Sequence, residues 1–124
     1  MHKVLLIDDD PGVRGVLRMM LQSLNVQVIE AANGVAGLSI FRKHKPHLVI
    51  TDIMMPEKDG IETLREMRVI DPKARIIAIS GGGGGKYANP LALARELGAV
   101  AAFEKPLHRQ QFVTAVSRAL AVPA

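Results

Sequence analysis

Short apolar runs that alternate with helical patterns are the feature of this sequence that most constrains its fold. Residues 48–50 form a continuous apolar segment that is too brief for a core helix, and such runs are typical of strands buried on both faces of a parallel sheet. Similar segments cover residues 4–7, 26–32, 74–80 and 99–103, with helical patterns between them. This alternation predicts a parallel sheet with right-handed crossovers.

The length of 124 residues fits one domain. We expect that domain to cover residues 1–121 and a short tail to cover residues 122–124. No run approaches the roughly 18 to 20 apolar residues of a membrane span, and no signal-peptide pattern opens the chain. We therefore expect a cytoplasmic protein. The absence of cysteine excludes disulfides, thiolate catalysis and cysteine-ligated zinc.

The net charge of +4 raises the question of an anionic partner. The sixteen Lys and Arg residues are scattered from Lys3 to Arg118 without a dense block. That distribution is typical of a soluble basic surface. We therefore expect neither direct nucleic-acid binding nor a membrane partner.

Polar residues stand where the apolar runs end. In chain order these residues are Asp8, Asp9, Asp52, Ser80 and Lys105. In open α/β sheets ligands bind at the carboxyl ends of the strands, so we expect these side chains at one edge. Clustered acids need a positive partner, and Lys105 would supply it. Asp10 has a structural explanation instead, because Asp10 followed by Pro11 is typical of a helix start.

Five consecutive glycines, residues 81–85, precede Lys86 and suggest a phosphate-binding loop. The spacing excludes a P-loop, because its GxxxxGK[ST] pattern would require glycine at Ser80 and serine or threonine at Tyr87. We expect a long glycine loop instead. The Asn89-Pro90 pair predicts a new helix that begins there and runs to Leu97.

The residues present argue against two other kinds of site, a phosphatase site and a histidine metal site. A phosphatase with a DxDx nucleophile motif would need an acid at Met54. His44 and His47 have a ligand-like spacing, but Pro46 interrupts the helix that would align them. We therefore expect surface histidines rather than a metal site.

Taken together, three motifs resemble the receiver domains of two-component response regulators over essentially the whole chain. The segment LLIDDDPGVR is similar to the family's acidic pair and first helix, DIMMPEKDG to its phosphoacceptor motif, and EKP to its lysine and proline. The resemblance implies a stand-alone, chemotaxis-regulator-like protein. It also implies a flavodoxin-like, doubly wound sheet of five parallel strands in the order 2-1-3-4-5, flanked by five helices.

The resemblance further implies that Asp52 accepts a phosphoryl group from a sensor histidine kinase or a histidine phosphotransfer protein. Lys105 and Ser80 would bind phosphoryl oxygens. One Mg²⁺ would be held by three carboxylates and one backbone carbonyl, those of Asp8, Asp9, Asp52 and Met54. The protein would be a signalling switch and not an enzyme. Its output would be an unknown downstream protein or a phosphorylation-dependent dimer.

The alternative is a receiver-like scaffold that works without phosphate, although a pure scaffold has no need of clustered carboxylates. The family's aromatic switch position holds Ala102 here. Phe103 should face the opposite side of the sheet and pack against a helix. We therefore hypothesise that residues 81–97 carry the signal. Met54 and Gly82 offer no group to orient water, which predicts a long-lived phosphoryl state.

Overall fold

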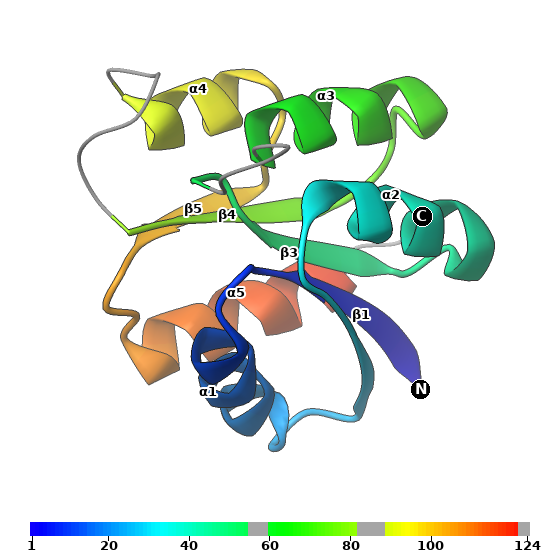
Figure 1. The fold of residues 1–124 in the computed structure, drawn as a ribbon. Helices are drawn as coiled ribbons and strands as arrows, with labels where there is room; N and C mark the ends of the chain where they lie inside the picture. The colour runs from blue at the N-terminus through cyan, green and yellow to red at the C-terminus, as the bar shows by residue number, and fades with distance from the viewer. Residues whose placement is uncertain (55–59, 82–88, 122–124) are drawn as a thin grey trace.

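Five parallel strands form one sheet in the order β2-β1-β3-β4-β5, as predicted (Figure 1). The computed structural model describes residues 1–54, 60–81 and 89–121. The strands are β1 (His2–Ile7), β2 (Val26–Ala31), β3 (Leu48–Asp52), β4 (Ile76–Ser80) and β5 (Ala101–Glu104). β5 begins two residues later than expected, because the amide of Ala99 still closes the preceding helix by donating to Ala94 O. β2 likewise ends one residue earlier than expected.

Helices cover both faces of the sheet, and the fold is flavodoxin-like, as expected (Figure 1). The helices are α1 (Pro11–Leu21), α2 (Gly34–His44), α3 (Gly60–Ile70), α4 (Pro90–Glu96) and α5 (Arg109–Ala121). α1 and α5 pack together on one face, while α2, α3 and α4 form the layer on the other face. None of the helices in the described ranges is long and apolar enough to cross a bilayer.

Each face of the sheet has its own core. On β1, Leu5 and Ile7 pack beneath α2 and α3, whereas Val4 and Leu6 pack against α1 and α5. All four side chains are buried, and full burial of such a side chain stabilises the fold by about 1.5–3 kcal/mol. Burial on both sides explains why these strands read as continuous apolar runs rather than alternating ones.

Phe103 and Ala102 lie on opposite faces of β5, as predicted. The Phe103 ring meets Phe112 of α5 edge to face, with 6.0 Å between the ring centroids. Ala102 is buried in the core beneath α3 and α4. His44 and His47 are exposed, which confirms them as surface residues. The predictions for the glycine loop beyond Gly81, and for the tail, lie outside the described residues.

Candidate functional site at the carboxyl ends of the strands

The strand order brings together acidic residues that are far apart in the sequence. β1 and β3 are neighbours, with Ile7 paired to Thr51. The next residues along these two strands are Asp8 and Asp52, and both are buried. One carboxylate oxygen from each of Asp8, Asp52 and the exposed Asp9 lies within 4.8 Å of the others. The predicted convergence of the three carboxylates is therefore present.

Local backbone contacts hold these acids in place. Asp10 is the N-cap of α1, where its Oδ1 accepts a hydrogen bond from the amide of Gly12 at 2.8 Å. The amide of Asp10 donates to Asp8 Oδ1 at 2.9 Å. The start of α3 presses against the end of β3, since a Cβ on Gly60 would overlap the carbonyl of Asp52. Glycine at position 60 therefore permits this close approach.

Lys105 lies opposite the carboxylates and contacts two of them. Its Nζ donates to Oδ2 of Asp8 and to Oδ2 of Asp52, each at 3.1 Å. Burial alone would lower the pKa of Lys105, but the hydrogen bonds and negative charges of Asp52 and Asp8 outweigh it and raise that pKa. The ammonium group is thus held in its charged form between two acids.

Asp52 uses its two oxygens differently. Oδ1 accepts the amide of Met54 at 2.8 Å, while Oδ2 faces Lys105. Burial raises the pKa of Asp52, the bonds from Met54 and Lys105 oppose that rise, and the charge of Asp8 adds to it. A further cation beside Oδ2 would favour the ionised form. The predicted role of the Met54 carbonyl stays a prediction.

Ser80 ends β4 beside this group. In the sheet register Asp52 is paired with Ile79, so Ser80 lies one residue beyond that pair. The amide of Lys105 donates to the carbonyl of Ser80 at 2.8 Å, which joins the ends of β4 and β5. Ser80 itself is buried. The structure therefore places all the predicted side chains at one sheet edge.

Sequence reasoning missed Arg14 of α1. Its Nη1 donates to the carbonyl of Asp8 at 2.6 Å, and its Nε donates to Glu30 Oε1 at 2.9 Å. Arg14 thereby braces the end of β1 against β2. The usable signal is its position one helical turn after the N-cap Asp10, since a side chain there lies near the helix start. Only the strand order reveals Glu30 as its partner.

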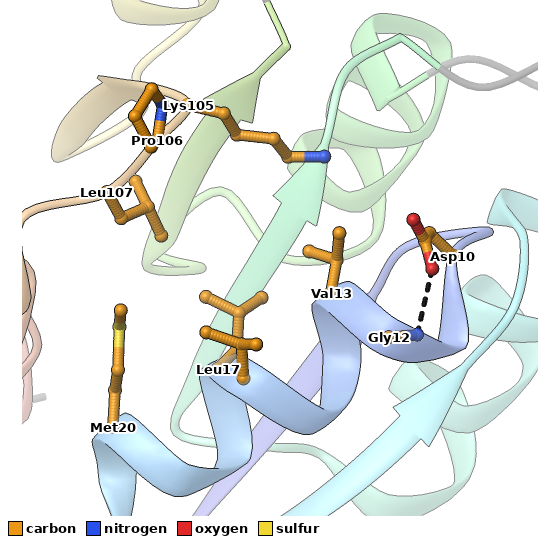
Figure 2. A pocket seen from close by; sticks show the side chains of 9 residues that line it. Asp10, Gly12, Val13, Leu17, Met20, Lys105, Pro106 and Leu107 are labelled. Carbon is orange, nitrogen blue, oxygen red and sulfur yellow. Dashed lines mark hydrogen bonds between the residues drawn. The ribbon is translucent and has the colours of Figure 1, made fainter.

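A groove of about 380 Å³ also escaped the sequence analysis (Figure 2). Figure 2 shows Val13, Leu17 and Met20 of α1 on one side and Pro106 and Leu107 on the other. Lys105 lines the groove as well. An apolar channel therefore leads along α1 toward the charged site.

The chain matches the family model for the response regulator receiver domain over residues 4–117. It is 36% identical over 119 residues to sporulation initiation phosphotransferase F of Bacillus subtilis (strain 168), covering 96% of this chain and 94% of that protein. It is 33% identical over 120 residues to chemotaxis protein CheY of the same strain, covering 96% and 98%.

Solved structures of similar proteins support the same family assignment. A response regulator receiver domain protein from Clostridium thermocellum superposes with a TM-score of 0.88 at 30% identity, covering 97% of this chain and 94% of that one. FixJ-N superposes with a TM-score of 0.86 at 27% identity, covering 100% and 98%. The chain therefore belongs to the response regulator receiver domains of two-component signalling. Such domains generally bind Mg²⁺ at an acidic site and interact with histidine kinases or phosphotransfer proteins.

Proposed function

We propose that this protein is a phosphorylation-dependent switch in which Asp52 accepts a phosphoryl group from a phosphohistidine. The observation that carries the proposal is the position of Lys105 Nζ, 3.1 Å from both Asp8 and Asp52, beside a three-carboxylate cluster. Phosphoryl transfer needs an oxygen nucleophile and positive charge around the transferred oxygens, and little else from the protein.

The reaction would exchange one bond for another. An oxygen of Asp52 would attack phosphorus while the P–N bond to the donor imidazole breaks. The bonding pair stays on that ring nitrogen, and because the other ring nitrogen carries a proton, the ring leaves as neutral imidazole. Lys105 already faces Oδ2 of Asp52, so a phosphoryl group formed there would meet its ammonium. Ser80, at the end of the adjacent strand β4, would donate to another phosphoryl oxygen.

The donor set of the carboxylate cluster fits Mg²⁺, which prefers oxygen ligands. Asp8, Asp9 and Asp52 would hold the ion together with the carbonyl of Met54. When bound, Mg²⁺ would neutralise charge that develops on the phosphoryl oxygens. Burial of Asp8 and Asp52 supports the assignment, because two buried carboxylates separated from water need more positive charge than one lysine supplies.

The surroundings of the site suit a protein donor. Asp52 is only 4% exposed, so a donor histidine must enter from the sheet edge. The apolar groove along α1 reaches Lys105, and Val16 and Met19 of α1 are 52% and 65% exposed. An amphipathic helix of a kinase or phosphotransfer protein can bury these side chains while presenting its phosphohistidine.

The acceptor is the protein's own side chain, so the product is a modified protein and not a released metabolite. We therefore propose a signalling role rather than an enzymatic one. The downstream target would be a separate protein or a second phosphorylated copy. We also propose that the phosphoryl group is long-lived, because Met54 beside the site carries no group that can orient water.

Incubation with Mg²⁺ and acetyl phosphate tests the proposal directly. Intact mass spectrometry should find one added phosphoryl group on the wild type and none on Asp52→Asn. Asp71→Asn is the matched control, because Asp71 is an exposed acid in the α3–β4 connection. An unmodified wild type, or equal labelling of Asp52→Asn, would favour the phosphorylation-independent scaffold.

A further inference from the structure

Arg68, in the last turn of α3, ties two other segments together through its guanidinium. Its Nη1 donates to the carbonyls of Pro72 at 2.7 Å and Ala74 at 2.9 Å, in the connection to β4. Its Nε donates to the carbonyl of Leu97 at 3.2 Å, and its Nη2 donates to the carbonyl of Gly98. The second pair of carbonyls belongs to the C-terminal end of α4, so one side chain joins α3, the connection that leads to β4, and α4.

The C-terminal end of α4 is built around this guanidinium. Gly98 has a positive φ of 101°. Its amide donates to Arg95 O and that of Ala99 donates to Ala94 O, which is the pattern of a Schellman motif. A Cβ on Gly98 would overlap the guanidinium of Arg68. Glycine therefore serves both the backbone conformation and the approach of the arginine, and the cation meets the negative end of the helix dipole.

Further contacts hold the same end of α4. Arg95 Nη2 donates to the carbonyl of Ala102 in β5 at 3.2 Å. The amide of Val100 donates to Ile76 O in β4 at 2.8 Å. Ala94 is fully buried in the core beneath this end of the helix. The last turn of α4 and the residues after it are thus tied to α3, β4 and β5.

The N-terminal end of α4 has a different kind of support. Among the described residues, Asn89 caps its first turn, where Asn89 Oδ1 accepts the amide of Ala92 at 3.2 Å, and Leu91 and Leu93 add apolar packing against the core rather than hydrogen bonds to a neighbouring element. Asn89 is exposed. This end of the helix is the one that follows Ser80 in the chain. In β5, the residue facing α4 is Ala102, whose side chain is too small to relay a displacement by changing rotamer.

We propose that Arg68 is a positioning residue for signal output: it anchors the C-terminal end of α4, so that a change at Ser80 displaces the N-terminal end of the helix about Gly98. The inference rests on the proposed function and adds which part of the α4 surface responds. Anchoring one end converts a small movement near Ser80 into a rotation of a seven-residue helix. Residues 90–93 would then be the part of α4 that a downstream partner distinguishes.

Site-resolved amide exchange with and without Mg²⁺ and beryllium fluoride, as a phosphoryl mimic, tests this inference. In the wild type, the mimic should change exchange at residues 91–93, since Pro90 has no amide hydrogen, and leave residues 97–100 within about twofold. In Arg68→Gln, residues 97–100 should exchange at least about tenfold faster without the mimic, because local opening becomes easier. The mimic should then affect both ends of α4 alike.

Arg65→Gln is the matched control, because Arg65 is an exposed arginine on the same helix. It should behave as the wild type. Arg68→Lys keeps the charge but cannot reach both pairs of carbonyls, so its exchange at residues 97–100 should be intermediate and it serves if Arg68→Gln folds poorly.

The experiment distinguishes failure of the proposed function from failure of the output role of Arg68. If ¹⁹F NMR shows that the wild type does not bind the mimic, the proposed function fails and the output role of Arg68 fails with it. If the mimic binds, but Arg68→Gln and Arg68→Lys lose stability while keeping the contrast between the two ends of α4, Arg68 is purely structural. That result would overturn the inference and leave the proposed function intact.

Discussion

The carboxyl ends and the amino ends of the strands, called here the carboxyl edge and the amino edge of the sheet, hold their charged groups in different ways. At the carboxyl edge, the ammonium of Lys105 lies 3.1 Å from two buried carboxylates. At the amino edge, Lys3 Nζ donates to the carbonyl of His44, at 3.5 Å and in an exposed position. Buried charges are costly unless they are paired, whereas exposed ones interact weakly. The comparison teaches that the charges of the carboxyl edge are maintained at a cost in stability, as a functional site requires.

Replacement of Lys105 should show the largest difference between the two edges. Lys105→Met leaves the buried acids Asp8 and Asp52 without their cation, and we expect the free energy of unfolding to fall by about 2–4 kcal/mol. Urea unfolding measures this change. Mg²⁺ should restore more stability to the variant than it adds to the wild type, because the ion replaces the missing charge.

Lys3→Met is the control for that experiment, because Lys3 belongs to the exposed amino edge. Its effect should stay within about 0.5 kcal/mol. Equal losses in Lys3→Met and Lys105→Met would remove the distinction between the edges.

The close packing of Gly60 against the carbonyl of Asp52 at the carboxyl edge predicts a smaller loss of stability when Gly60 is replaced. Gly60→Ala places a methyl group against the carbonyl of Asp52, so we expect a loss of about 1–3 kcal/mol from overpacking. Phosphorylation by acetyl phosphate should slow as well, since the end of β3 must shift. The control is Gly15→Ala in α1, where a Cβ meets no atom within 4 Å. Thermal unfolding should find Gly15→Ala as stable as the wild type or more so.

The pH dependence of stability should also separate the two edges. The pKa of Asp52 is raised in the folded state, mainly by burial, so the folded protein binds this proton more tightly than the unfolded chain does. The contribution of Asp52 to stability therefore improves as pH falls through its raised pKa toward the ordinary carboxyl range. The free energy of unfolding, measured by urea unfolding at several pH values in this window, should change with pH at different slopes for the wild type and for Asp52→Asn. Parallel curves would contradict the burial of a charged Asp52.

The smallest effect should come from His47 at the amino edge. Its Nδ1 accepts the amide of Lys3 at 2.8 Å, and its ring meets that of His2 edge to face. Slight burial and the positive charges of His2 and Lys3 lower the pKa of His47. His47→Gln should change the free energy of unfolding by no more than about 0.5 kcal/mol. A loss comparable with that of Lys105→Met would show that the amino edge also holds costly charges.

The sequence was sufficient to predict what depends on the order of residues along each strand. The run before Asp52 predicted a buried strand, and strand ends at Asp8 and Ser80 predicted one shared edge, because parallel strands align their carboxyl ends. Contacts that depend on three-dimensional placement were missed. Arg68 reaches carbonyls up to 30 residues away in the chain, and no periodicity encodes such a bond. The late start of β5 likewise follows from the helix ending around Gly98.

Reductive trapping of the phosphorylated residue tests the central claim most directly. After incubation with acetyl phosphate and Mg²⁺, borohydride converts an aspartyl phosphate to homoserine, which peptide mass spectrometry locates. The account predicts homoserine at position 52 when Mg²⁺ is present, and none when a chelator is added before acetyl phosphate. Homoserine at another aspartate, or none in a protein that binds Mg²⁺, would contradict the assignment of Asp52 as the phosphoryl acceptor.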